Sequence, residues 1–194
     1  MAYTVKNKKL RIAFIIIAVL VPFPRMYVGV HTPLDVLVAA GMALVLIFAL
    51  RPVVFERDGK YFPVLLGAMT VTAAAFLCFV EFYPFPADID EHNLASGIKN
   101  AYTLLGALLG LLLVYVVDEK WLKFSTKAVW WAQIIKSALG LLLVLAVKSG
   151  LKVPLNAMFG ESVGRAARYI LIVVVAGIVW PLTFKWFARL GKKK

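Results

Sequence analysis

The stretch that decides the fold is Phe62–Phe82, which reads FPVLLGAMTVTAAAFLCFVEF and contains one charged residue, Glu81. About 20 apolar residues in a row make a helix long enough to cross the hydrocarbon core of a bilayer. Five further hydrophobic runs surround this stretch, at about residues 10–24, 34–50, 98–117, 128–147 and 168–187. The 194-residue chain is 62% hydrophobic and 16% charged, whereas soluble domains are about 25% charged. The sequence therefore predicts an all-α, polytopic integral membrane bundle of about six transmembrane helices.

The formal net charge of +12 does not indicate a nucleic-acid partner. Nucleic-acid binding needs a basic stripe on a water-exposed face, and the polar segments here are short connections between hydrophobic runs. If alternate loops share a side of the membrane, 15 of the 22 Lys and Arg residues lie on the side of the amino terminus and six on the other. Because basic loops stay in the cytoplasm, we expect a cell-membrane protein with both termini in the cytoplasm.

The residues most capable of chemistry join the first two hydrophobic runs, in the stretch Pro24-Arg-Met-Tyr-Val-Gly-Val-His-Thr-Pro-Leu-Asp35. On the expected topology this stretch faces the extracytoplasmic side. His31 and Asp35 are four residues apart, so a carboxylate can approach and orient an imidazole. The other ring nitrogen of the histidine is then left as a base or a nucleophile. Arg25 offers a planar set of donors that suits phosphate oxygens.

A purely structural interpretation of the same residues is open. Thr32 followed by Pro33 predicts the start of a helix, because threonine caps helices and proline fits the first turn. Thr32 and Asp35 then have the spacing of a capping box, in which the carboxylate only caps the helix. Arg25 can equally extend to lipid headgroups.

The pattern Arg25, five residues, His31, three residues, Asp35 resembles the third signature motif, Ser-Arg-x5-His-x3-Asp, of a known family. The family is the type 2 phosphatidic acid phosphatase superfamily, which also includes the vanadium haloperoxidases. The resemblance implies a membrane phosphatase like the bacterial lipid-phosphate phosphatases. By resemblance, His31 matches the nucleophile that forms a phosphohistidine, Asp35 the carboxylate that orients it, and Arg25 a residue that binds phosphate oxygens. No metal or other cofactor is implied, because arginine and lysine donors supply the charge stabilisation.

The substrate that this resemblance implies is a lipid phosphate or pyrophosphate, whose headgroup enters at the extracytoplasmic interface while its tail stays among the membrane lipids. Undecaprenyl pyrophosphate, phosphatidic acid and phosphatidylglycerol phosphate are the candidates, and the residues do not choose among them.

Two further motifs of the family, Lys-x6-Arg-Pro and Pro-Ser-Gly-His, are absent from the sequence, and Pro24 stands where the third motif usually has serine. In the family both missing motifs precede the third. We therefore expect the chain to be the carboxy-terminal part of a longer enzyme. Residues 1–50 would be part of a phosphatase core, and residues 51–194 would be a carboxy-terminal four-helix transmembrane extension. The alternatives are a non-catalytic or degenerate membrane module, or half of a split enzyme completed by a partner chain or by a homodimer.

Other residues in the later runs leave alternatives open. Gly106 and Gly110 predict a close approach of two helices, either within the bundle or at a dimer seam. Lys136 lies within a predicted span, where it either extends to the cytoplasmic face or faces a polar cavity. The last outer loop is basic, and its cations either attract an anionic lipid headgroup or meet surface lipid. These cations are Lys148, Lys152, Arg165 and Arg168.

Overall fold

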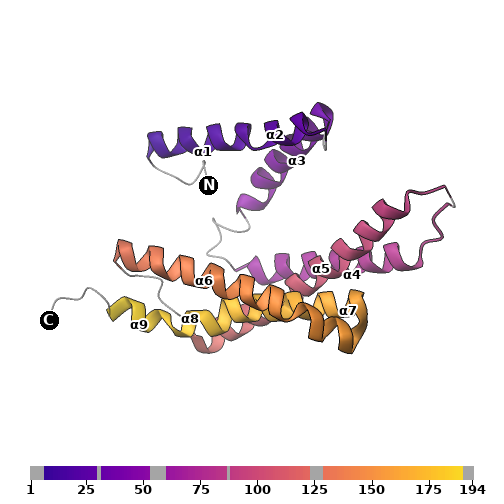
Figure 1. Ribbon diagram of the computed structural model, residues 1–194. Coiled ribbons are helices and arrows are strands. Elements are labelled where there is room, and N and C mark those ends of the chain that lie inside the picture. The colour runs from indigo at the N-terminus through magenta and orange to yellow at the C-terminus, as the bar shows by residue number, and fades with distance from the viewer. Residues whose placement is uncertain (1–6, 30–31, 53–59, 87, 123–128, 190–194) are drawn as a thin grey trace. The chain divides into compact units, whose positions relative to one another are not determined.

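The computed structural model describes residues 7–29, 32–52, 60–86, 88–122 and 129–189, and all regular structure in these ranges is helical (Figure 1). This finding confirms the all-α fold class predicted from the hydrophobic runs. The chain divides into two compact units, Met1–Tyr61 and Phe62–Lys194. The division predicted at residues 50 and 51 stays a prediction.

Five helical segments of the described chain are long and apolar enough to cross a membrane, and they correspond to the second to sixth predicted runs. Two of them contain short π-helical stretches, labelled η. The segments are α3 (Pro33–Arg51), α4 (Phe62–Phe82), α5 with η2 (Glu91–Val117, Asp118–Leu122), α6 (Trp130–Gly150), and α7 with η3 and α8 (Lys152–Val174, Val175–Val179, Trp180–Leu182). A last short helix, α9, spans Phe184–Arg189.

The first predicted run, 10–24, is divided between two helices. It forms α1 (Lys8–Leu20) and α2 (Pro22–Tyr27), because Pro22 has no N–H and interrupts the helical hydrogen bonds. The 13 residues of α1 extend about 20 Å, less than the roughly 30 Å of a hydrocarbon core. Val21 between the helices keeps helical angles, with φ −61° and ψ −40°, so α2 continues along the line of α1 (Figure 1). The α1–α2 pair thus stands in place of the first predicted span.

Unit 1 holds α1, α2 and α3, and neither α1 nor α3 has a buried residue. Their exposed side chains are predominantly large and apolar, among them Ile16, Leu20, Leu37 and Val45. A helix that is apolar all around is stable in lipid, because its backbone groups are paired internally and its side chains need no contact with water.

Unit 2 has a packed core between α4 and α5. Leu66 and Ala73 of α4 and Leu108 of α5 are buried together, and the ring centroids of Phe62 and Tyr115 lie 5.5 Å apart. These apolar side chains fill the contact between the two helices.

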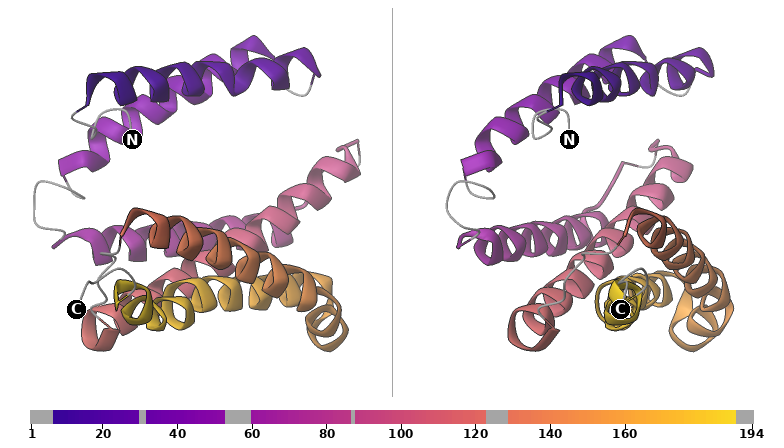
Figure 2. Two further views of the ribbon diagram at one scale, coloured as in Figure 1. Left: turned by 60° about the vertical axis from the view of Figure 1, so that its left-hand side comes forward. Right: turned by 90° about the vertical axis from the view of Figure 1, so that its left-hand side faces the viewer.

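Helix α5 also packs closely against α7, and two glycines make this possible (Figure 2). A Cβ atom on Gly106 would collide with the backbone of Ala166, and one on Gly110 would lie 2.9 Å from the Cβ of Val173. The predicted close approach at Gly106 and Gly110 is therefore confirmed, and it occurs within the bundle.

The basic segment expected to be the last outer loop is mostly helical. It forms the end of α6 and the part of α7 up to Arg168, and α7 bends at Gly160 with φ 76° and ψ 172°. Positive φ of this kind favours glycine. Beyond the bend, the second half of α7 crosses the first so closely that a Cβ on Gly164 would lie 2.6 Å from the carbonyl oxygen of Leu155. The connection between the last two predicted runs is therefore helical, and its side of the membrane stays a prediction.

Candidate active site

The predicted catalytic residues come from the junction of α2 and α3, at one end of unit 1 (Figure 1). Arg25 belongs to α2, which closes with hydrogen bonds of 3.0 Å from Val28 N to the Pro24 carbonyl and from Gly29 N to the Met26 carbonyl. Gly29 has φ +74°, a conformation that ends the helix and that other residues adopt at a cost. The local sequence therefore turns the chain away from α2 shortly before His31.

Of the three predicted site residues, Arg25, His31 and Asp35, the structure describes the side chain of Asp35. His31 and the side chain of Arg25 lie outside the described residues. The roles predicted for Arg25, His31 and Asp35 accordingly stay predictions.

The start of α3 is a capping box. Thr32 has extended angles, φ −80° and ψ 158°, and its Oγ1 accepts a hydrogen bond from Asp35 N at 3.2 Å. In return, Thr32 N donates to Asp35 Oδ2 at 2.8 Å. Pro33 occupies the first turn, where its missing N–H has no intrahelical partner to lose. The helix start predicted from Thr32 and Pro33 is confirmed.

The capping box constrains what Asp35 can do. Its Oδ2 is engaged with the backbone, which fixes the orientation of the carboxylate on the first turn of α3. A carboxylate has about four lone-pair sites, so one cap hydrogen bond leaves it able to accept others. The carboxylate also lies at the positive end of the helix dipole, which stabilises a negative charge there. Capping and orientation of a neighbouring imidazole are therefore compatible roles for this carboxylate.

A groove of about 1060 Å³ lies between the α1–α2 pair and α3, and Asp35 is the charged residue in its wall. The small side chains of Ala39, Ala40 and Ala43 leave space along α3. The remaining wall is apolar and consists of Phe14, Ile15, Ala18, Val19, Val21, Pro22, Val36 and Leu44. The groove thus combines an apolar wall with one carboxylate, that of Asp35.

Metal ligands do not gather in the described part of the chain, where no group of three His, Cys, Asp or Glu side chains is placed to hold an ion. Asp90 of the acidic segment near His92 instead caps α5, accepting a hydrogen bond from Asn93 N at 3.0 Å.

Lys136 is covered by protein and does not extend to the open surface. It is 6% exposed, and its Nζ lies 4.3 Å from the centroid of the Phe184 ring. It borders a pocket of about 340 Å³ whose wall also includes Ser137 and Trp180. Of the two alternatives for Lys136, the structure favours an internal position in which an aromatic face stabilises the ammonium group.

The helices and their apolar surfaces define an all-helical, multi-pass membrane protein. Residues 102–193 match the family model described as PAP2 superfamily phosphatase, transmembrane extension. The match covers 92 of the 194 residues and supports membership of the PAP2 superfamily, the type 2 phosphatidic acid phosphatases. No curated protein and no solved structure matches the chain. The matched segment begins within α5 and excludes the junction of α2 and α3.

Proposed function

We propose that this protein hydrolyses a lipid phosphate or lipid pyrophosphate through a phosphohistidine intermediate on His31. The observation that carries the proposal is the spacing of Arg25, His31 and Asp35 at the junction of α2 and α3. The match of residues 102–193 to the PAP2 transmembrane extension supports it. The capping box supports it, because it orients the Asp35 carboxylate at the helix start that directly follows His31.

Each residue has one role in the proposed reaction. A neutral ring nitrogen of His31 attacks phosphorus while the bond from phosphorus to the leaving oxygen breaks, and Asp35 stabilises the imidazolium that forms. Arg25 donates to the non-bridging oxygens as their charge develops. Water then attacks the phosphohistidine, the phosphorus–nitrogen bond breaks, and inorganic phosphate leaves. The leaving oxygen takes its proton from water or from an acid outside these three residues.

The groove beside Asp35 supports a lipid substrate. Nine residues of α3 separate Asp35 from Leu44 along its wall, which corresponds to about 14 Å of helix. Each methylene buried against such a wall contributes about 0.8 kcal/mol. A substrate with a phosphate at the Asp35 end and a hydrocarbon tail along α3 would use both parts of the groove. The distribution of basic residues supports an extracytoplasmic position for this end and cytoplasmic termini.

A second candidate function is a membrane module that works only with a partner. The sequence lacks Pro-Ser-Gly-His, whose histidine protonates the leaving group in the family, and it lacks Lys-x6-Arg-Pro. A partner chain, or a second copy of this one in a homodimer, would then complete the site, or the module would have no catalytic role.

Phosphate release by the full chain in detergent tests both candidates, with undecaprenyl pyrophosphate and phosphatidic acid as separate substrates. We expect release that His31→Ala reduces to the background rate. His92→Ala is the matched control, because His92 is the other histidine of the chain and lies in the first turn of α5. Equal release by His31→Ala and wild type would refute the phosphohistidine proposal. No release by the wild type would favour the second candidate, and a partner carrying Pro-Ser-Gly-His should then restore it.

A further inference from the structure

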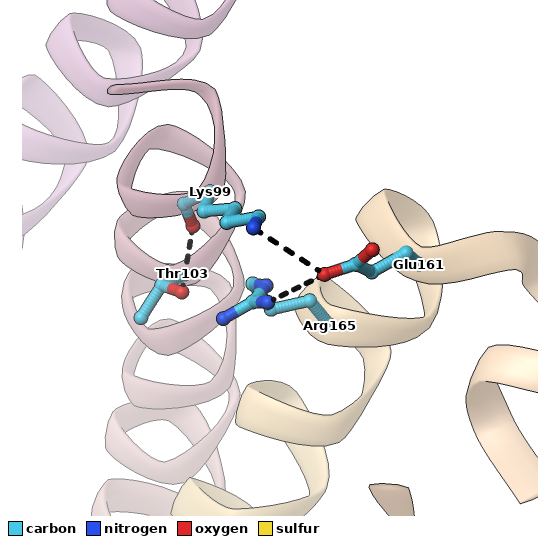
Figure 3. A network of polar contacts seen from close by, with 4 residues as sticks. All are labelled: Lys99, Thr103, Glu161 and Arg165. Carbon is cyan, nitrogen blue, oxygen red and sulfur yellow. Dashed lines mark hydrogen bonds and ion pairs between the residues drawn. The ribbon is translucent and has the colours of Figure 1, made fainter. Parts of the chain in front are cut away.

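Charged side chains of α5 and α7 meet near the start of α5 (Figure 3). Glu161 Oε1 accepts a hydrogen bond from an Nη atom of Arg165 at 3.1 Å and lies 3.8 Å from Lys99 Nζ. The side chains of Lys99 and Glu161 are 49% and 60% exposed, whereas that of Arg165 is 22% exposed. One carboxylate therefore meets two cations at a mostly open surface.

Arg168 follows Arg165 in α7 by about one helical turn, and it is only 5% exposed. No described carboxylate forms an ion pair with it, and its Nε is buried without a hydrogen-bond partner among the described residues. Its contact is with the Tyr169 ring, 5.9 Å from the guanidinium carbon to the ring centroid. A guanidinium does not lose its proton in proteins, so Arg168 is a covered positive charge, and such a charge is costly unless an anion compensates it.

The bend in α7 brings the first half of the helix against Gly164. Arg168 follows Gly164 by four residues and so lies on the same helical face. That face meets the first half of α7, because a Cβ on Gly164 would lie 3.0 Å from the Cα of Asn156. Asn156 Oδ1 and Arg165 Nε are also buried without hydrogen-bond partners in the described part of the chain. Two arginine donors and one amide acceptor are therefore unsatisfied along one bent helix.

The side chains near the bend of α7 carry a net positive charge, which favours binding of an anion. Lys99, Arg165 and Arg168 carry three positive charges, and Glu161 is the acidic residue paired with this group. Arginine forms two parallel hydrogen bonds with phosphate or carboxylate oxygens. Phosphate is the anion that phospholipid headgroups supply at a membrane surface.

We propose that Arg168, with Arg165 and Asn156, binds a phosphate-bearing anion at the bend of α7 in the transmembrane extension. The two guanidinium groups donate to the phosphate oxygens, and Asn156 Oδ1 accepts from a hydroxyl group of the ligand. An anionic phospholipid headgroup and free inorganic phosphate share this chemistry. The site is formed by residues of unit 2, whereas Arg25, His31 and Asp35 belong to unit 1, and it does not depend on the function proposed for them.

Thermal unfolding of the full chain in detergent tests the site, because a ligand that binds the folded state raises the unfolding temperature. The probes are phosphatidylglycerol, phosphatidylcholine and inorganic phosphate, each titrated separately. Stabilisation by phosphatidylglycerol alone identifies a lipid headgroup as the source, and stabilisation by inorganic phosphate as well identifies the phosphate group as sufficient. Phosphatidylcholine, which has no net charge, is expected to bind more weakly than phosphatidylglycerol.

Variants separate this site from general surface charge. We expect Arg168→Gln to weaken the apparent affinity for phosphatidylglycerol at least ten-fold. Lys148→Gln is the matched control, because it removes the same charge from an exposed position at the end of α6, and it should change the affinity less than two-fold. Arg168→Lys keeps the charge without the planar donors and should give an intermediate affinity.

Three results would overturn the proposal. They are no stabilisation of the wild type by any probe, equal affinities of wild type and Arg168→Gln, and equal losses in Arg168→Gln and Lys148→Gln. If Arg168→Gln does not fold, Arg168→Lys and Asn156→Ala provide the same comparison with Lys148→Gln. Wild-type affinity in both of those variants would also overturn the proposal.

Discussion

The two units of this protein differ in what holds their helices. In unit 1, α1 and α3 have no buried residue and enclose an apolar groove beside Asp35. In unit 2, α4, α5 and α7 share a packed core, and glycines admit backbone contacts. The predicted chemistry lies in the loosely packed unit, whereas the family match covers most of the packed one.

This difference shows that packing and chemistry are specified by different features of the sequence. A catalytic motif needs a few side chains at fixed spacing on helix ends, and local hydrogen bonds such as the Thr32–Asp35 cap can orient them. A packed bundle needs small residues placed where two helices cross, and Gly106 and Gly110 provide these. Variants in each unit should accordingly affect different measurements.

The largest expected effect is on catalysis in unit 1. Asp35→Asn should lower phosphate release by about 10²- to 10⁴-fold, because a neutral amide does not stabilise an imidazolium as a carboxylate does. Thr32→Ala removes the cap hydroxyl and should cost about 1 kcal/mol of stability while the folded protein keeps its activity. Phosphate release and thermal unfolding are measured for both variants. Equal losses of activity in the two would mean that Asp35 acts only as a cap.

The next effect concerns packing, and it compares one glycine from each unit. Gly106→Ala places a Cβ against the backbone of Ala166 and should destabilise the protein by about 1–3 kcal/mol. A Cβ on Gly41 of α3 would have no heavy atom within 4 Å, so Gly41→Ala should stabilise the helix by up to about 1 kcal/mol through its higher helix propensity. Thermal unfolding in detergent measures both. A similar destabilisation by the two variants would remove the contrast between the units.

The sequence predicts those features that depend on neighbouring residues. Thr32, Pro33 and Asp35 predict the start of α3 because a capping box spans only four positions. The five long spans follow from apolar length alone. Pro22 also lies inside the first run, and the interruption there follows from its missing N–H.

Features that depend on tertiary contacts could not be predicted in this way. The part of α7 up to Arg168 includes the polar residues Lys152, Asn156, Glu161 and Arg165, so hydropathy alone favours a connection between spans. Arg168 is buried, and Gly164 admits the backbone of Leu155, and no sequence spacing reveals either feature. Asn156 lies at this fold-back and Glu161 pairs with Lys99 of α5, and nothing in the local sequence indicates either contact.

A smaller effect is expected at Lys136, and a double-mutant cycle isolates it. The ammonium group lies 4.3 Å from the Phe184 ring centroid, and such a contact contributes about 0.5–2 kcal/mol. Lys136→Met and Phe184→Leu, alone and together, should show a coupling energy in this range when thermal unfolding is measured. Additive effects of the two substitutions would show that the contact does not stabilise unit 2.

The smallest expected effect lies at Glu161, where the surface of unit 2 is open. Its side chain is 60% exposed, and its partners are Arg165 and Lys99. Exposed ion pairs contribute about 0–1 kcal/mol, so Glu161→Gln should lower the unfolding free energy by less than about 1 kcal/mol. The same substitution removes the carboxylate that pairs with Arg165 and that would compete with a phosphate for it. Phosphatidylglycerol should therefore bind a few-fold more tightly. Weaker lipid binding without loss of stability would mean that Glu161 holds Arg165 in place for the anion. A loss of stability as large as that of Gly106→Ala would mean that the ion pairs, rather than the glycine contacts, hold α5 against α7.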